Sequence, residues 1–472
     1  MRWMLLGPEV YTFLAALGFL GISLAGRPNS GRDHLAALCL SGVGVLLAAS
    51  ALSEDAILFS EVYRVDLFSQ VFKLLLSVGL FLIVCICGEV REIREENRSD
   101  FFALIFFCTL AMMLLVSGNH LLTLYLSLEL SSYSLYVLVS LRRARDMGVE
   151  AGIKFFLVGI FASALMLFGM AVLYAMTRTM NLNALNGALH GMMGQPLVLL
   201  GVVLTLSGFL FKLACFPFHL WVPDVYQGAA NEVTAYLAAV SKLAGMAAIL
   251  RFVASVGQGG ADLVQVLLVF SVASMTLGNL AAITQQDLKR LLGYSTVAHA
   301  GYVLIGVLTL SASGYASVVF YALALLVMKF TAFLVVVKVA GNGTNLHINQ
   351  LAGLHRRSPV LAMALMVSLF SLAGIPPTVG FTGKFLIFVA AMEKGHFALV
   401  LIAMANVLIS LYYYLLVIKA AYLLEPEGET GPIAVSAPTK VLATALVGAM
   451  VLAGFYPYPF MEIAQAAVGV LP

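Results

Sequence analysis

The segment FKLACFPFH, residues 211–219, decides the fold of this chain. It closes an apolar run that begins near residue 195, so Lys212 lies inside a stretch long enough to cross a membrane. Pro217 follows five residues later and His219 seven residues later. A proline inside a helix removes a hydrogen bond and leaves a carbonyl without its partner. The segment therefore predicts a membrane helix that is broken beside a buried lysine.

The composition of the whole chain indicates the same environment. Of its 472 residues, 62% are hydrophobic and 10% are charged, and the mean hydropathy is +1.01. Soluble domains are about 45–50% apolar and about 25% charged, so a water-soluble fold is excluded. No basic tract with interleaved aromatic residues suggests nucleic-acid binding. At about 20 apolar residues per span, we expect an all-α polytopic membrane protein of about 14 transmembrane helices in a single membrane domain, residues 1–472.

Apolar runs separated by polar breaks place these helices. The twelfth contains Gly374-Ile375-Pro376-Pro377, which ends seven residues before Lys384, so we expect it to be broken as the seventh is. The lysine precedes the proline in the seventh helix and follows it in the twelfth. This relation is typical of two inverted repeats with discontinuous helices. The expected helices lie near 5–25, 34–53, 67–89, 101–117, 120–141, 149–176, 195–216, 229–254, 263–285, 294–312, 315–341, 358–390, 395–423 and 437–460.

The basic residues of the short loops predict an orientation, because cytoplasmic loops are enriched in lysine and arginine. Thirteen cations fall in one set of loops and five in the opposite set, so both termini are expected to face outward. The first set is Arg27, Arg32, Arg91, Arg94, Arg98, Arg142, Arg143, Arg145, Lys289, Arg290, Arg356, Arg357 and Lys440; the second is Arg2, Arg64, Arg178, Arg251 and Lys394.

Five charged residues fall within expected spans, where each costs about 2.5–3.5 kcal/mol on insertion scales. With four lysines and one carboxylate, direct pairing can neutralise at most one lysine. Desolvation lowers the pKa of a lysine and a nearby carboxylate raises it, so a lysine between these influences exchanges a proton when its partner moves. We interpret the set as a proton relay rather than as structural ion pairs. Its members are Glu129, Lys154, Lys212, Lys242 and Lys384.

Other polar residues in the spans have weaker assignments. His219 and His299 can pass protons between the lysines, or serve equally as structural hydrogen-bonding groups. Lys329 lies deep in its expected span. For Lys73 the sequence leaves open whether the side chain snorkels to the membrane surface or is buried. The sequence contains no Walker loop, dinucleotide fingerprint or metal-ligand cluster. We therefore expect no cofactor in this chain, and the energy for transport to come from an ion gradient or a partner.

Several motifs together resemble subunit N of bacterial respiratory complex I, the NADH–quinone oxidoreductase. The resemblance runs from roughly residue 67 to 425, and the DVYQG stretch at 224–228 separates this family from its L and M relatives and from multisubunit sodium–proton antiporters. The matching motifs are FKLACFPFHLWVPDVYQG (211–228), LSLEL (126–130), AGIKFFL (151–157), GNLA (278–281), KRLLGYS (289–295), AGIPP (373–377) and GFTGKF (380–385).

The resemblance implies an antiporter-like, proton-translocating subunit in the bacterial inner membrane, with both termini on the periplasmic side. Its implied parts are an N-terminal three-helix segment (1–100), a first repeat of helices 4–8 (101–254), a second repeat of helices 9–13 (263–423) and a C-terminal helix (437–472). FMN, iron–sulfur clusters and quinone would belong to partner subunits. The implied partners are the antiporter-like and small membrane subunits, the lipid bilayer and, indirectly, the hydrophilic redox arm.

The same resemblance assigns roles residue by residue. Glu129 and Lys212 would form a coupled ion pair that Lys154 modulates, Lys242 would be the central relay of the first half, and Lys384 would face the outer exit. One segment departs from the family pattern: residues 228–234, GAANEVT, lack two expected prolines, and Glu232 adds an acidic residue at the cytoplasmic mouth. Lys329 also stands where no family lysine is expected.

Three alternatives remain open from the sequence. The chain could be a stand-alone or Mrp-type cation–proton antiporter subunit, because buried lysines fit that function equally. It could be a scaffold that anchors a quinone or redox module and whose lysines are passive. A variant of the first hypothesis keeps the fold but receives electrons from reduced ferredoxin or a deazaflavin instead of NADH.

Overall fold

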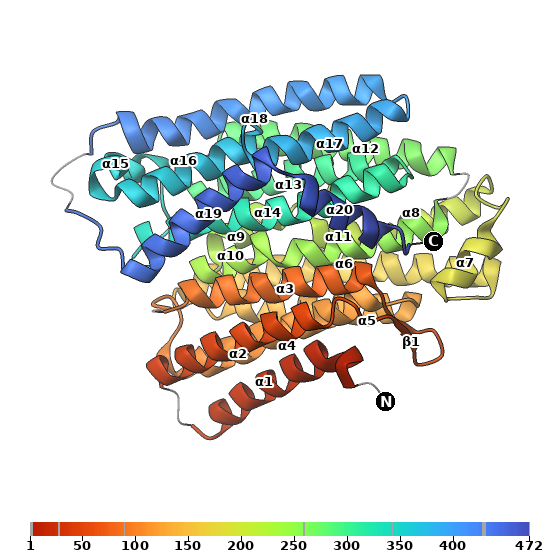
Figure 1. Cartoon of the computed structure of the whole chain (residues 1–472), viewed down its shortest axis with the longest axis horizontal. Helices are drawn as coiled ribbons and strands as arrows, with labels where there is room; N and C mark the ends of the chain where they lie inside the picture. Colours follow the sequence, from red (N-terminus) through yellow and green to blue (C-terminus); the bar gives the residue numbers. More distant parts are fainter. Residues whose placement is uncertain are drawn as a thin grey trace.

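Long helices lie side by side along the molecule in the computed structural model, which describes residues 3–26, 29–88, 90–257, 260–341, 343–426 and 431–471 (Figure 1). The unbroken membrane-length helices are α1 (Gly7–Leu24), α2 (Ser30–Ser50), α3 (Leu67–Ile86), α4 (Arg98–Ser117), α5 (Leu121–Ser140), α6 (Arg145–Thr177), α12 (Ala261–Ile283), α13 (Leu288–Leu308), α14 (Ala312–Val339), α18 (Phe397–Leu423) and α19 (Ala437–Phe455).

Three further passages are interrupted. They are α8 (Pro196–Leu213) with α9 (Val222–Gly228), α10 (Asn231–Ala239) with α11 (Ser241–Val256), and α16 (Pro359–Ala373) with α17 (Val379–Glu393). Thirteen described spans are long and apolar enough to cross a membrane, and the pair α16–α17 adds one passage. The all-α membrane fold and the fourteen expected helices are thus confirmed.

Both expected breaks are present, and each begins with a residue in the left-handed conformation. Ala214 ends α8 at φ 68°, and Gly374 ends α16 at φ 90°. The prolines that follow cannot continue the helical hydrogen bonding. The interruption at Val240, between α10 and α11, was not expected from the sequence, because no proline or glycine marks it.

Several short elements were also not expected. A two-stranded antiparallel hairpin joins α2 to α3, with Ala56 opposite Val65. A short helix follows α19 at the C-terminal end, beyond the last expected span. These elements are β1 (Ala56–Leu58), β2 (Tyr63–Val65), η1 (Trp3–Leu6), η2 (Glu95–Asn97), α7 (Leu182–Leu189), η3 (Ile348–Leu351), α15 (Leu354–Arg357) and α20 (Tyr458–Val468).

The helices of the two halves pack in the same order. In the first half α4 packs on α5, α6 runs along α8, and α11 contacts α8; in the second, α12 packs on α13, α14 contacts α16 and α17, and α18 contacts α16. The α10–α11 span is fully buried, whereas 22% of the α2 window is buried. The central helices therefore form the core, with α1–α2 and α18 at opposite edges of Figure 1. The repeat boundaries 101–254 and 263–423 stay a prediction.

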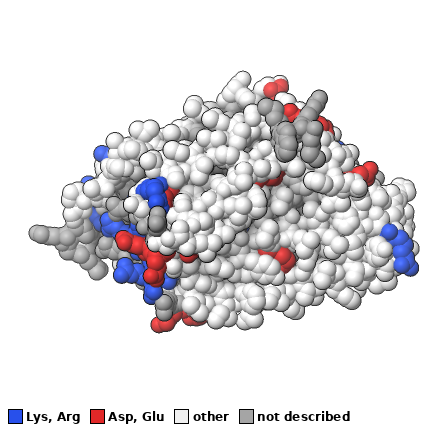
Figure 2. Space-filling view, turned by 90° about the horizontal axis from the view of Figure 1, so that it is seen from below, with Lys and Arg blue, Asp and Glu red and all other residues white. Residues whose placement is uncertain are grey.

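Charged side chains are unevenly distributed over the surface. In Figure 2 lysine and arginine gather mainly at one end of the molecule, and the band between the two ends is almost free of charge. A wide band of uncharged side chains is what contact with lipid requires. Arg2 and Arg27, two of the cations used to predict the orientation, lie outside the described residues.

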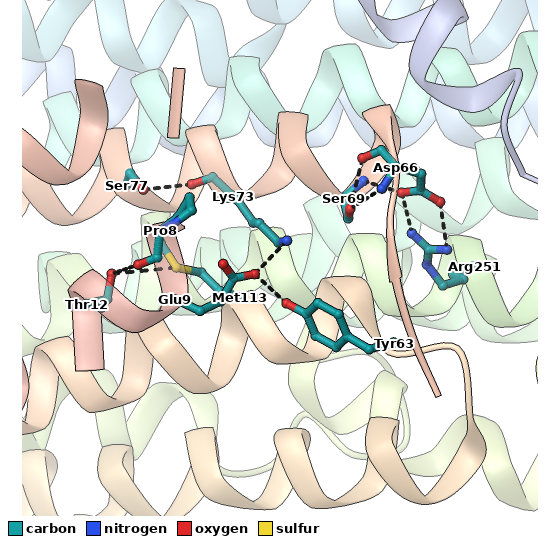
Figure 3. Close-up of polar contacts among 10 residues, drawn as sticks. All are labelled: Pro8, Glu9, Thr12, Tyr63, Asp66, Ser69, Lys73, Ser77, Met113 and Arg251. Atoms are coloured by element: carbon teal, nitrogen blue, oxygen red, sulfur yellow. Dashed lines mark hydrogen bonds and ion pairs between the residues drawn. The ribbon is translucent and has the colours of Figure 1, made fainter. Parts of the chain in front are cut away.

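The N-terminal helix is held to α3 by a buried ion pair (Figure 3). Lys73 Nζ lies 2.6 Å from Glu9 Oε1, and the hydroxyl of Tyr63 donates to the same carboxylate. Lys73 is 0% exposed and Glu9 4% exposed. The open question about Lys73 is thus answered: this lysine does not snorkel, and its charge is balanced by a carboxylate on α1.

A second ion pair joins the start of α3 to the far end of α11. Asp66 caps α3 through its bond from the Ser69 amide, and its two carboxylate oxygens accept from Arg251 Nη1 and Nη2 at 3.1 and 2.9 Å (Figure 3). Burial alone would raise the pKa of Asp66, but the Arg251 guanidinium outweighs it and holds that pKa below its ordinary value. The two hydrogen bonds from one guanidinium hold the start of α3 in position and also balance the charge of Asp66.

Glu9→Gln should destabilise the chain strongly, because it leaves the Lys73 ammonium buried without a counter-charge. Removing one partner of a buried pair costs about 3–5 kcal/mol. The thermal unfolding midpoint of the purified chain in detergent should fall accordingly. The double variant Glu9→Gln/Lys73→Met, which removes both charges, should recover much of the loss. An unfolding midpoint equal to wild type for Glu9→Gln would contradict this structural role.

Candidate functional site

The break after α8 places two lysines at one helix end. Lys242, on α11, donates from Nζ to the main-chain carbonyl of Lys212 at 2.9 Å. The same ammonium lies over the Trp221 ring, 4.6 Å from its centroid. A cation over a desolvated aromatic face gains about 2 kcal/mol. The carbonyl that the break exposes is thus taken by a lysine of a neighbouring helix.

Lys212 and Glu129 lie close together but do not form a direct ion pair. Lys212 Nζ donates to Ser131 Oγ at 2.7 Å, while Glu129 accepts a hydrogen bond from Ser163 on α6. Lys212 is 3% exposed and Glu129 7% exposed. The ion pair implied by the family resemblance is therefore absent in this conformation. Each charged group is held by a serine hydroxyl instead.

The second break has the same chemistry. Lys384, on α17, donates from Nζ to the carbonyls of Leu372 and Ala373 at 2.8 and 3.0 Å, which are the last carbonyls of α16. Its ammonium lies 4.8 Å from the centroid of the Tyr302 ring. A Cβ at Gly374 would approach the Lys384 side chain to 3.2 Å, so glycine gives this lysine room as well as the left-handed turn.

A chain of hydrogen-bonding side chains occupies the centre of the second half. Lys329 Nζ donates to Ser295 Oγ at 2.7 Å, and that hydroxyl is 2.6 Å from the hydroxyl of Tyr414. The Tyr414 hydroxyl lies 3.3 Å from His299 Nε2, and His299 Nδ1 lies 2.6 Å from the Tyr321 hydroxyl. Four different side-chain types are thus connected without a gap.

Lys329 links the two halves of the molecule. It is 1% exposed and lies within electrostatic range of Lys242 in the first half and Lys384 in the second. The sequence predicted that Lys329 is buried, but not that it lies between Lys242 and Lys384. His299 was predicted to lie among hydroxyl groups, and the structure brings it into the chain that begins at Lys329. Among the described residues, a hydrogen bond joins Lys242 to Lys212 and a chain of hydrogen bonds joins Lys329 to His299, whereas Lys384 is related to Lys329 and His299 by electrostatic interaction only. All are buried, and together we call them the buried row.

Lys154 was wrongly placed among the buried charges. Its side chain is 44% exposed and forms ion pairs with Glu150 at 2.8 Å and with Asp224 at 2.7 Å. It makes no hydrogen bond to Lys212 in the described part of the chain. The apolar run predicted that Lys154 lies on a membrane helix, and it does lie on α6. Its side chain points outward, however, to Asp224 of α9.

His219 lies apart from the buried row. It sits in the turn between α8 and α9, where its ring packs near Phe216 and its Nδ1 has no hydrogen-bond partner. The predicted transfer from His219 to a lysine has no supporting contact here and stays a prediction.

The DVYQG stretch (224–228) connects α9, which follows the helix break, to α13 in the second half of the molecule. Asp224 accepts from Arg290 Nη1 at 2.6 Å while pairing with Lys154, and Gln227 accepts from the same arginine at 3.1 Å. Burial alone would raise the pKa of Asp224, but Lys154 and Arg290 together outweigh it and hold that pKa below its ordinary value. One carboxylate thus ties α9 to α6 and to α13.

Comparisons with known proteins agree with this architecture. The family described as "NADH:quinone oxidoreductase/Mrp antiporter, TM" matches residues 118–410. "NADH-quinone oxidoreductase subunit N 2" of Syntrophobacter fumaroxidans is 62% identical over 471 residues and is covered, like this chain, over 100% of its length.

Solved structures give the same picture of the fold. A chain of respiratory complex I from Thermus thermophilus with bound aureothin superposes with a TM-score of 0.84 at 30% identity, covering 97% of this chain and 99% of that one. A chain of the Mrp complex from Dietzia sp. superposes with a TM-score of 0.88 at 20% identity, covering 100% and 98%. The latter likeness shows the fold alone.

Asp224→Asn should loosen the junction of α6, α9 and α13 through the loss of both ion pairs. Because the pKa of Asp224 is lowered in the folded chain, the pairs persist at every pH above about 4, the ordinary range of an aspartate. They weaken only as the pH falls through the lowered value. Being partly exposed, they are worth about 1 kcal/mol or less. The unfolding midpoint of Asp224→Asn should therefore be slightly lower than wild type at pH 7, and this difference should vanish in strong acid.

Proposed function

The chain belongs to the NADH:quinone oxidoreductase/Mrp antiporter family of membrane subunits, and within it to the N subunits of NADH-quinone oxidoreductase, and on that premise we propose that its buried lysines carry protons across the membrane. The observation that carries this proposal is the row of lysines at the two helix breaks. Lys212, Lys242 and Lys384 each have hydroxyl, carbonyl or aromatic partners rather than a carboxylate. Such partners bind an ammonium without fixing its charge permanently.

The first half acts as the switch in this mechanism. Glu129 and Lys212 are held apart by Ser163 and Ser131 in the conformation described here. When the carboxylate approaches the ammonium, the charged form of Lys212 is favoured; when they separate, Lys212 tends to release its proton. The proton passes through water to Lys242, whose Nζ is held beside the break by its hydrogen bond to the main-chain carbonyl of Lys212.

The second half carries the proton onward. Lys329 takes it from Lys242, and the hydroxyls of Ser295 and Tyr414 pass it to His299. Lys384 releases a proton to the outer side when the first half resets. Moving one charge against 100 mV takes about 2.3 kcal/mol, which shifts of a few pKa units can supply at about 1.36 kcal/mol each.

Within the enzyme, this chain is the proton-translocating membrane subunit and redox chemistry takes place elsewhere. FMN, iron–sulfur clusters and quinone are held by partner subunits, and this chain has no redox site. Its partners are the other membrane subunits and, indirectly, the hydrophilic arm. The end rich in basic side chains faces the bacterial cytoplasm, and both termini face the periplasm. The likeness to a chain of complex I of Thermus thermophilus supports the assignment to such a complex.

An alternative function is cation–proton exchange without a redox partner. The likeness to the Mrp chain supports the fold of this alternative and nothing further at 20% identity. The 62% identity to an N subunit favours the respiratory assembly. If proton movement required sodium, cation–proton exchange would be favoured. If the chain co-purified with flavin and iron–sulfur subunits, the redox pump would be favoured. The identity of those subunits would also separate NADH from ferredoxin or a deazaflavin as donor.

Lys212→Ala in the intact complex should abolish or strongly reduce proton pumping, because it removes the ammonium beside Glu129. The measurement is the number of protons moved per electron pair in inverted membrane vesicles. Arg143→Ala, a change at an exposed position of the same chain, should leave that number unchanged. Full coupled turnover of Lys212→Ala would overturn the relay and favour a scaffold with passive lysines.

Tyr414→Phe should slow pumping, because it removes the hydroxyl that connects Ser295 with His299. A control is Tyr315, a buried tyrosine at the start of α14 whose hydroxyl is not part of this chain of groups among the described contacts. Tyr315→Phe should therefore pump at close to the wild-type rate. Equal pumping by both variants would exclude Tyr414 as a connection between the two groups.

A further inference from the structure

A polar cavity of about 500 Å³ opens at the end of the bundle where α3, α10 and α14 terminate or begin. Glu92, Asn231, Glu232, Lys338 and Thr439 are among the residues that line it. The start of α10 and the start of α19 lie together at the left of Figure 1, the end at which charged side chains gather in Figure 2. The cavity is large enough for several water molecules.

Glu232 lines this cavity and has a carboxylate oxygen without a hydrogen-bond partner. The residue is 4% exposed, and its Oε2 has no hydrogen-bond partner, in contrast to the general rule that buried polar groups are paired. Asn231 Oδ1, beside it in the first turn of α10, is also without a partner. Two unpaired acceptors at one polar cavity require a donor, and water or a proton supplies it.

Cations outnumber carboxylates around Glu232. Glu92 opposes it but is paired with Arg142 at 2.9 Å and accepts from the Asn231 amide at 3.0 Å. Burial raises the pKa of Glu92 in spite of Arg142 and Lys289. Lys338 lines the same cavity, and Lys289 on α13 donates to the carbonyl of Ala229 at 2.8 Å. Arg91 also lines the cavity, and Cys87 lies within electrostatic range of Glu232.

Polar groups follow one another along α13 from the end that carries Lys289. Lys289 is buried and lies within electrostatic range of Glu232. The carbonyl of Leu292 and the hydroxyl of Ser295 follow on the same helix, and both accept from Lys329. Glu232 therefore interacts with the first lysine of the helix that also carries acceptors of the proposed relay.

We propose that Glu232 is the proton-collecting group of this chamber. It takes a proton from water in the cavity, which neutralises the carboxylate, and returns to the carboxylate when the proton moves inward to a neutral lysine amine. This inference rests on the proposed function, since it needs a relay to receive the proton. It gives a role to Glu232, which lies in the segment that departs from the family pattern.

The test compares Glu232→Gln with wild type in the complete complex, in inverted vesicles whose medium reaches the chamber. A collecting carboxylate matters most where protons are scarce, so the variant should pump several-fold more slowly at alkaline medium pH and nearly normally at acid pH. Glu232→Asp, which keeps the carboxyl group, should restore much of the alkaline rate. Glu96→Gln, at an exposed carboxylate of the same end, should match wild type at every pH.

Ala434→Cys, in the wall of the chamber, gives a measurement that does not depend on pumping. A membrane-impermeant thiol reagent should modify it in inverted vesicles faster than it modifies the cysteines of the wild-type chain, and a lack of modification would overturn the chamber. A pH profile of Glu232→Gln equal to wild type, while Lys212→Ala blocks pumping, would overturn the role of Glu232 and leave the relay standing. If Lys212→Ala also pumps normally, both proposals fall.

Discussion

The structure depends on the rule that a main-chain carbonyl cannot remain unpaired in an apolar medium. Two helices end inside the bundle, at Ala214 and Gly374, and leave carbonyls without a helical partner. In both places a lysine ammonium donates hydrogen bonds to these carbonyls. Without the lysine, the break would leave carbonyls unpaired. Without the break, the buried ammonium would lack these carbonyls as acceptors. Each stabilises the other, which explains how strongly polar groups persist in the centre of an apolar bundle.

The buried lysines fall into two groups with different physical roles. Lys73 has a carboxylate as its partner and connects α1 to α3. Lys212, Lys242, Lys329 and Lys384 have only neutral partners. A fixed counter-charge suits a structural bond, whereas neutral hydroxyls, carbonyls and rings accept the amine in either protonation state. The kind of partner thus separates structural from exchangeable charge better than burial does.

Local patterns were sufficient to predict the spans, both proline-linked breaks and the lysines beside them, because length, hydropathy and proline act within one segment. Contacts between segments could not be predicted in this way. The outward direction of Lys154 depends on Asp224, seventy residues away, and the Glu9–Lys73 pair depends on how α1 packs. The interruption at Val240 has no local signal. The serines that separate Glu129 from Lys212 appear only when α5, α6 and α8 are placed together.

The interruption at Val240 has a mechanical consequence. Beyond it, α11 is anchored at its far end, because Arg251 grips Asp66 with two hydrogen bonds. Before it, α10 carries Glu232 and continues into α11 through Val240, whose amide still bonds to the carbonyl of Tyr236. One passage therefore carries Glu232 and Lys242 on either side of the irregular residue. A change of bend at Val240 would alter the distance between these two groups while Arg251 holds α11 in place.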